Sequence, residues 1–198
     1  MENKRTIQQH IDLFERIQAE ILEKNGGIDV SDWGILNTDE CGIARKDKLG
    51  RIVIPKEHEN RRGHKQVSKM AHITMVNLIN SKGTVGEPMI IVTGKNKTKN
   101  MRNYNDSFLR GTRCPFAVSE SGYVNDTIFE VDVVPWIIEK VRELRKSKGD
   151  KDQKLWVLLT LDQFGSHIKI HDALKQLRDN KIDVYGFPSH CSACKCTI

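Results

Sequence analysis

The chain has 198 residues and a mass of 22.7 kDa, and its composition of 38% hydrophobic and 29% charged residues fits one ordinary globular domain with a single core. No apolar run approaches the roughly 20 residues that a membrane-spanning helix needs, which argues against an integral membrane protein. The net charge of +6 and the pI of about 9.1 favour a polyanionic partner, most simply nucleic acid.

The N-terminal segment predicts an amphipathic helix rather than a signal peptide, because charged residues at 1–5 are not followed by a uniformly apolar stretch. Within residues 5–24, apolar side chains recur at steps of three and four, at Ile7, Ile11, Phe14, Ile17 and Ile21. Gly26 and Gly27 end this helix. We expect a linker helix over 1–30, a domain over 31–198, reduced cysteines and a cytosolic or, more specifically, nuclear location.

The first half of the domain reads as strands separated by two basic segments. Residues 33–44 predict a short apolar strand that runs into Asp39 and Glu40, and residues 72–83 and 87–95 predict an antiparallel pair joined by a Lys-Gly turn. The basic segments are residues 45–69, with a possible strand at 51–55, and residues 95–113. Each is interpreted either as a solvated loop or as a surface that contacts phosphates.

The second half predicts a strand–helix–strand unit. A short strand and turn at 116–125 precede residues 126–146, which have helical spacing and which Pro135 should divide into two pieces. A strand over 156–162 that is apolar on both faces, an amphipathic helix over 168–182 and a strand over 183–188 follow. The pattern indicates an α/β fold, in which helices pack on a mixed sheet and the last two strands are parallel.

Two carboxylates stand where apolar strands stop. Asp162 follows the run Trp156–Leu161, and Asp39 follows Gly34–Leu36. Ligands in α/β sheets usually bind beyond the carboxyl ends of strands, and two carboxylates at one edge can hold Mg²⁺ for phosphodiester chemistry. The alternative is that Asp162 or Ser166 caps the next helix.

Five motifs resemble, in order and spacing, the DDE endonuclease domain of pogo/mariner-type transposases: "NTDECGIA", "EPMIIVTGK", "SESGYVN", "LLTLDQFGSH" and "VYGFPSH". The resemblance covers residues 10–196. It implies a ribonuclease H-like fold and a site of three carboxylates that uses Mg²⁺ or Mn²⁺ to cut and join DNA. Asp39 corresponds to the first catalytic and metal-binding acid of the family, and Asp162 corresponds to the second.

The chain also departs from that family. The position of the third acid falls after Ile198, so an active site would need Glu40, Glu120 or Asp126 instead. Other departures are Gln163 and Phe164 after the second acid, Tyr123 in place of the usual Trp, and a cysteine-rich end. His167 resembles a family histidine that shapes the site. A zinc site at the end of the chain is a further alternative, formed by His190, Cys191, Cys194 and Cys196.

Together these features favour a DDE-type domain, truncated at both ends, that acts on or binds DNA and has impaired catalysis. The basic segments would supply non-specific phosphate contacts, chiefly through Arg45, Lys46, Arg61, Arg62, Lys95, Lys97, Lys99 and Arg102. The alternatives are a non-catalytic module that binds nucleic acid or protein, and a decaying gene fragment.

Overall fold

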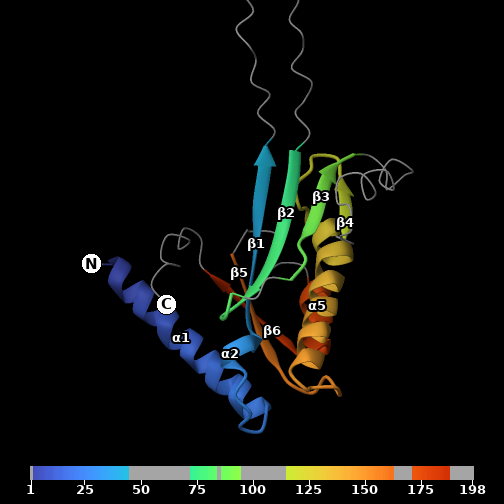
Figure 1. Ribbon diagram of the computed structural model, residues 1–198. Helices are drawn as coiled ribbons and strands as arrows, with labels where there is room; N and C mark the ends of the chain where they lie inside the picture. The colour runs from blue at the N-terminus through green and yellow to red at the C-terminus, as the bar shows by residue number, and fades with distance from the viewer. Residues whose placement is uncertain (1, 45–71, 84–85, 95–114, 163–170, 188–198) are drawn as a thin grey trace, which may run out of the picture.

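The computed structural model describes residues 2–44, 72–83, 86–94, 115–162 and 171–187, which form one six-stranded mixed sheet flanked by helices (Figure 1). The strands are β1 (Ile35–Ala44), β2 (His72–Asn80), β3 (Met89–Thr93), β4 (Phe116–Ser119), β5 (Val157–Asp162) and β6 (Ile182–Phe187). Their order across the sheet is β4-β3-β2-β1-β5-β6. The α/β class expected from the sequence is therefore confirmed.

Strand direction changes across the sheet. β2 pairs antiparallel with β1 on one side and with β3 on the other. The predicted antiparallel pair of β2 and β3 is therefore confirmed. β4 runs parallel to β3, β5 parallel to β1, and β6 parallel to β5. The predicted parallel arrangement of the last two strands is confirmed, and α6 (His171–Asp179) connects them.

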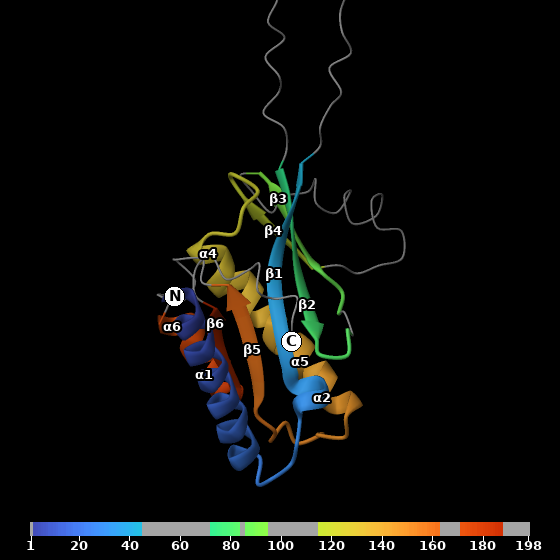
Figure 2. The same cartoon turned by 90° about the vertical axis from the view of Figure 1, so that its left-hand side faces the viewer.

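Helices cover both sides of the sheet (Figure 2). On one side, α5 (Val134–Ser147) contacts α6, which packs on β6. On the other side, α1 (Glu2–Lys24) packs on β5, and the short α2 (Ser31–Gly34) leads into β1. Among the described residues, no helix has the length and apolar character needed to cross a membrane.

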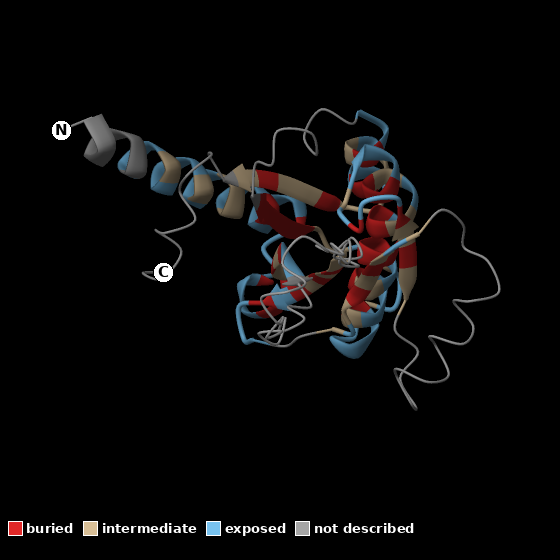
Figure 3. Cartoon of the chain, turned by 90° about the horizontal axis from the view of Figure 1, so that it is seen from above, coloured by how far each residue is buried: buried red, intermediate tan, exposed pale blue. Residues whose placement is uncertain are grey.

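The predicted apolar stripe of α1 packs on the domain only toward its C-terminal end. Ile21 is buried, Phe14 and Ile17 are partly buried, and the Phe14 ring lies edge-on to Tyr185 with centroids 5.7 Å apart. Ile11, in contrast, is 40% exposed. Figure 3 shows the N-terminal part of α1 extending away from the buried core, so the stripe is longer than the surface that it covers.

Asn25 fixes the other end of α1 to the sheet. Its side chain donates to the Trp156 carbonyl oxygen at 3.0 Å and accepts from the Trp156 N–H at 2.6 Å. The Lys24 ammonium lies 4.7 Å from the centre of the Trp156 ring and pairs with Asp183. These contacts hold α1 against the start of β5.

β5 is a central core strand, as predicted. Its residues from Val157 to Leu161 are each at most 4% exposed, so both faces are covered. The Thr160 hydroxyl is satisfied by the Leu36 carbonyl oxygen at 2.9 Å. The run of apolar residues is therefore explained by helices on both sides of this strand.

The predicted start and end of the first strand are wrong. Residues 31–34 form a helical turn, and β1 continues for five residues beyond Asp39. Asp39 and Glu40 mark a change of neighbours instead, because β5 pairs with β1 only from Ile35 to Thr38. Beyond Thr38, the pairing described for β1 is with β2 alone, so polar residues and Gly42 replace the core pattern.

The helix over 126–147 has no break at Pro135, contrary to the prediction. Helix α4 (Asp126–Ile128), the π-helical turn η2 (Phe129–Val133) and α5 follow one another without a gap. Pro135 is the second residue of α5, which directly follows the π-helical turn. The irregularity is a wider turn, in which the Val134 N–H donates to the Phe129 carbonyl oxygen.

Arg145 joins α5 to the turn before β6. Its guanidinium is 1% exposed and donates to the carbonyl oxygens of Asn180 and Lys181 at 3.0 and 2.9 Å. Burial lowers the pKa of Arg145 to about 10, although Asp150 opposes this shift. The side chain therefore remains charged at neutral pH.

Candidate functional site

The register of β1 and β5 brings the two predicted acids to neighbouring positions. The last paired residues of these parallel strands are Thr38 and Leu161, and Asp39 and Asp162 are the next residue on each strand. On its other side, Asp162 pairs with Phe187 of β6. The two acids therefore follow a pair of residues on adjacent strands, which lie about 4.8 Å apart where they pair.

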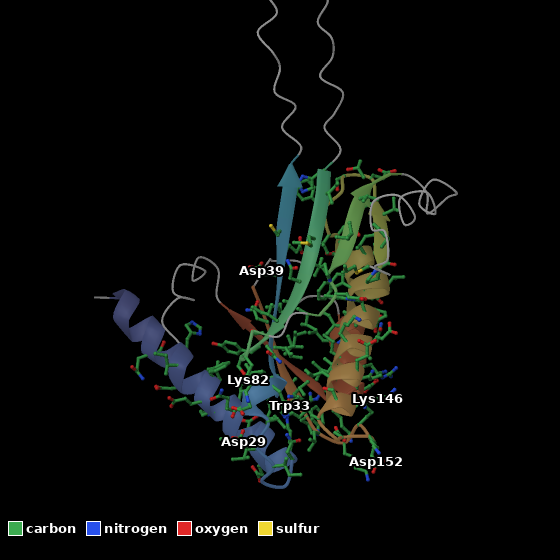
Figure 4. The ribbon with its side chains drawn as sticks, viewed as in Figure 1. Asp29, Trp33, Asp39, Lys82, Lys146 and Asp152 are labelled. Carbon is green, nitrogen blue, oxygen red and sulfur yellow. The ribbon has the colours of Figure 1, made fainter. Side chains whose placement is uncertain are left out.

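Asp39 is exposed at mid-height of β1 (Figure 4). Its Oδ1 accepts a hydrogen bond from the Glu40 N–H at 2.9 Å, and Asn77 of β2 is its partner in register. Exposure arises here because β1 loses β5 as a neighbour. The position combines a solvent-accessible carboxylate with a rigid strand, which suits a ligand site.

The three substitutes considered for the third acid do not gather at this pair. Glu40 is adjacent to Asp39 on β1, and its side chain leaves the strand on the opposite face. Glu120 and Asp126 follow β4, which β3 and β2 separate from β1. Within the residues that the structure describes, no group of three or more His, Cys, Asp or Glu could hold a metal ion.

The alternative of a helix cap at Asp162 stays a prediction. The described part of α6 begins at His171, and residues 163–170, between Asp162 and that helix, lie outside the described residues. Ser166, the other proposed cap, lies outside the described residues.

Several predicted features lie in the parts of the chain that the structure does not describe. They include the eight basic residues expected to contact phosphate, which are Arg45, Lys46, Arg61, Arg62, Lys95, Lys97, Lys99 and Arg102. They also include Gln163, Phe164, His167, the possible strand at 51–55 and the cysteine-rich end at 190–196.

A hollow lies between α1 and the start of β1, apart from the acid pair. It has a volume of about 230 Å³, and its lining includes Leu22, Val30, Ile35 and Leu158. Its polar lining residues are Gln18, Asp29 and Ser31, and the pKa of Asp29 is lowered because the Ser31 N–H donates to its carboxylate at 2.8 Å. The hollow is mainly apolar and has fewer groups that could bind a metal or catalyse a reaction than the acid pair.

One feature of the surface was missed by sequence reasoning. The Tyr123 ring stacks on the His72 ring with centroids 3.9 Å apart and an angle of 21° between the planes. Fifty-one residues separate the two in sequence, so no local pattern links them. The available signal was Gly122, which marked a tight turn before an aromatic residue.

The geometry defines an α/β protein with two acidic residues that directly follow the last paired residues of two adjacent parallel strands. Such a pair can take part in holding a hard divalent cation, which prefers oxygen ligands. Comparison of the chain with protein-family models, curated proteins and solved structures gives no match.

Proposed function

We propose that this chain is a DDE-type endonuclease domain of transposon origin, with a ribonuclease H-like fold, that binds DNA and has impaired cleavage. The observation that carries the proposal is that Asp39 and Asp162 directly follow the last paired residues of β1 and β5. An antiparallel β1–β2–β3 sheet continued by the parallel strands β5 and β6 supports the ribonuclease H-like part. The five sequence motifs support the family assignment. Because proteins of that family act on DNA, we also propose that this chain is nuclear.

Asp39 and Asp162 would hold Mg²⁺ or Mn²⁺, because one or two carboxylates plus substrate phosphates are a common ligand set for such ions. A metal bound there would activate water and stabilise the leaving oxygen of a phosphodiester. The protein's own contribution is to fix the two carboxylates on a sheet whose β5 is buried on both faces. Cleavage is impaired in this proposal because the described residues bring no third acid to the pair.

The first experiment measures Mn²⁺ binding by electron paramagnetic resonance, and Tm with and without Mn²⁺. We expect the wild type to bind the ion and to gain stability from it, since a ligand of the folded state raises Tm. Asp39→Asn and Asp162→Asn should each lose both effects. Glu40→Gln is the matched control, because it removes one exposed carboxylate from the same strand, and it should behave like the wild type.

Nicking of supercoiled DNA by the same four proteins tests the catalytic part. We expect slow or undetectable nicking by all of them with Mg²⁺ or Mn²⁺. Rapid nicking by the wild type that is lost in both Asp variants would show that catalysis is intact. Equal Mn²⁺ binding by the wild type and the Asp variants would refute the metal site.

The distribution of charge favours non-catalytic DNA binding as the second candidate function. Residues 45–69 contain nine Lys and Arg against three Asp and Glu, and residues 95–113 contain six against one. These two segments therefore carry +11, while the whole chain carries +6, which leaves −5 for the rest. Positive charge concentrated in two segments is typical of phosphate binding.

A further inference from the structure

The stacked pair of Tyr123 and His72 is a flat, exposed aromatic surface. One face of the Tyr123 ring is covered by the His72 ring, and yet Tyr123 remains 54% exposed. That exposure refers to the whole residue, and the face opposite His72 is the one on which a planar ligand can stack. His72 is only partly exposed and supports the ring from within.

The turn that carries Tyr123 is fixed to β2 and β3. The Thr74 hydroxyl donates to the Gly122 carbonyl oxygen at 2.7 Å in a buried position, and the Thr93 hydroxyl donates to the His72 carbonyl oxygen at 2.9 Å. Gly122 has φ of +78°. These contacts hold the ring in one place before any ligand arrives, which lowers the entropic cost of binding.

The described residues from which the chain enters the two basic segments, Ala44 and Gly94, lie at or directly after the ends of β1 and β3, which are the upper ends of these strands in Figure 1. Ala44 and His72, the residues that flank the first segment, pair with each other across β1 and β2. Gly94, which precedes the second segment, donates to the Ser119 carbonyl oxygen at 2.8 Å. The chain thus enters its most positive stretches beside the aromatic pair.

This corner is separate from the acid pair. Ala44, the register partner of His72, lies five residues beyond Asp39 on β1, which is about 17 Å along a strand. An odd number of residues also puts the two positions on opposite faces of the β1–β2 ribbon. A ligand at Tyr123 would therefore not share the metal site.

We propose that Tyr123, supported by His72, is a stacking platform for an unpaired base of single-stranded DNA. Every nucleobase has a π-face, so stacking on a held aromatic ring binds single strands without sequence preference. The two basic segments, which the chain enters after Ala44 and Gly94, supply positive charge that attracts the phosphates of the same strand. A base paired inside a duplex presents no free face, so duplex DNA does not gain from the platform. The inference rests on the proposed DNA binding and is independent of metal binding.

The test compares binding of fluorescein-labelled oligothymidine and of a duplex of equal length by anisotropy. Tyr123→Ala and Tyr123→Leu should weaken oligothymidine binding about 5- to 150-fold, the range for loss of one stacked base. Tyr123→Phe keeps the ring and should bind like the wild type. Leu is informative because it keeps an apolar side chain without a π-face. Duplex binding should change less than about twofold in all three variants.

A direct readout is an oligonucleotide that contains 2-aminopurine, whose fluorescence falls when the base stacks. We expect the wild type and Tyr123→Phe to quench it and Tyr123→Leu not to do so. Wild-type affinity for oligothymidine in Tyr123→Leu would overturn the stacking platform and leave DNA binding intact. Absence of binding to both DNA forms by the wild type would instead overturn the DNA-binding function, and the platform with it.

Discussion

At the scale of single residues, Gly122 explains how the Tyr123 turn is built. Its φ of +78° is in the region that favours glycine, and a Cβ there would stand 2.3 Å from the His72 carbonyl oxygen and 2.5 Å from the Thr93 hydroxyl. Gly83 has a similar φ of +74°, but a Cβ there would meet nothing within 4 Å. A side chain at Gly83 would therefore cause backbone strain alone, whereas one at Gly122 would cause backbone strain and a steric clash.

Replacement of these glycines by alanine should have unequal effects on stability. Gly83→Ala should cost about 1–2 kcal/mol, the penalty of left-handed backbone for a residue with a Cβ. Gly122→Ala should cost at least about 2 kcal/mol more, because backbone or Thr93 must also move. Urea unfolding measures both. Similar losses in the two variants would show that the turn can relax around an added methyl group.

The sequence singled out individual acidic residues, but it did not predict which side chains contact each other in the fold. Asp39 and Asp162 stood out because each interrupts an apolar pattern. The contact of His72 with Tyr123 did not, since it depends on the pairing of β1 with β2 and on the turn after β4. Contacts between distant residues leave no periodic signal in sequence.

At the scale of elements, a buried guanidinium connects α5 to β6. Arg145 satisfies two carbonyl oxygens of the turn before β6, one of them from Lys181, which has a positive φ of 59°. Arg142 is on the same helix and contacts the same turn through the Asn180 side chain at 2.7 Å, but it is exposed. Burial is thus the main difference between the two arginines.

Substitution of these arginines should reveal that difference. Arg145→Lys should lower the free energy of unfolding by about 3 kcal/mol, because one ammonium cannot reproduce the guanidinium's paired bonds and Asp150 loses its buried partner. Arg142→Lys should change it by less than about 0.5 kcal/mol. Thermal and urea unfolding provide the measurement, and equal losses for both would contradict the role assigned to burial.

At the scale of the whole molecule, the charge distribution predicts how DNA binding depends on salt. The two basic segments carry +11 against −5 for the rest. Phosphate contacts release counterions, so affinity falls with salt in proportion to their number. Replacement of Arg61 and Arg62 by Gln should reduce the slope of log K against log[salt] on duplex DNA by about 1.8, if each contacts one phosphate.

Lys146→Gln with Lys148→Gln is the matched control for charge. These lysines are exposed at the end of α5, and Lys146 lies at the end of the molecule opposite the tip of β1 and β2 (Figure 4). Removing them lowers the net charge equally, but it should leave the slope nearly unchanged. An equal decrease in both double variants would mean that net charge governs binding, rather than the basic segments.

The sequence by itself determined the elements whose residues show a strong local pattern. These are α1, the β2–β3 hairpin, the buried strand β5, and α6 with β6, and the composition fixed the excess of positive charge. Only the tertiary structure decided that β1 continues beyond Asp39, that Asp39 and Asp162 follow the last paired residues of adjacent strands, and that Tyr123 stacks on His72. The physical reason is range: periodicity reports the burial of a segment, whereas register and strand order are set by pairing between distant segments.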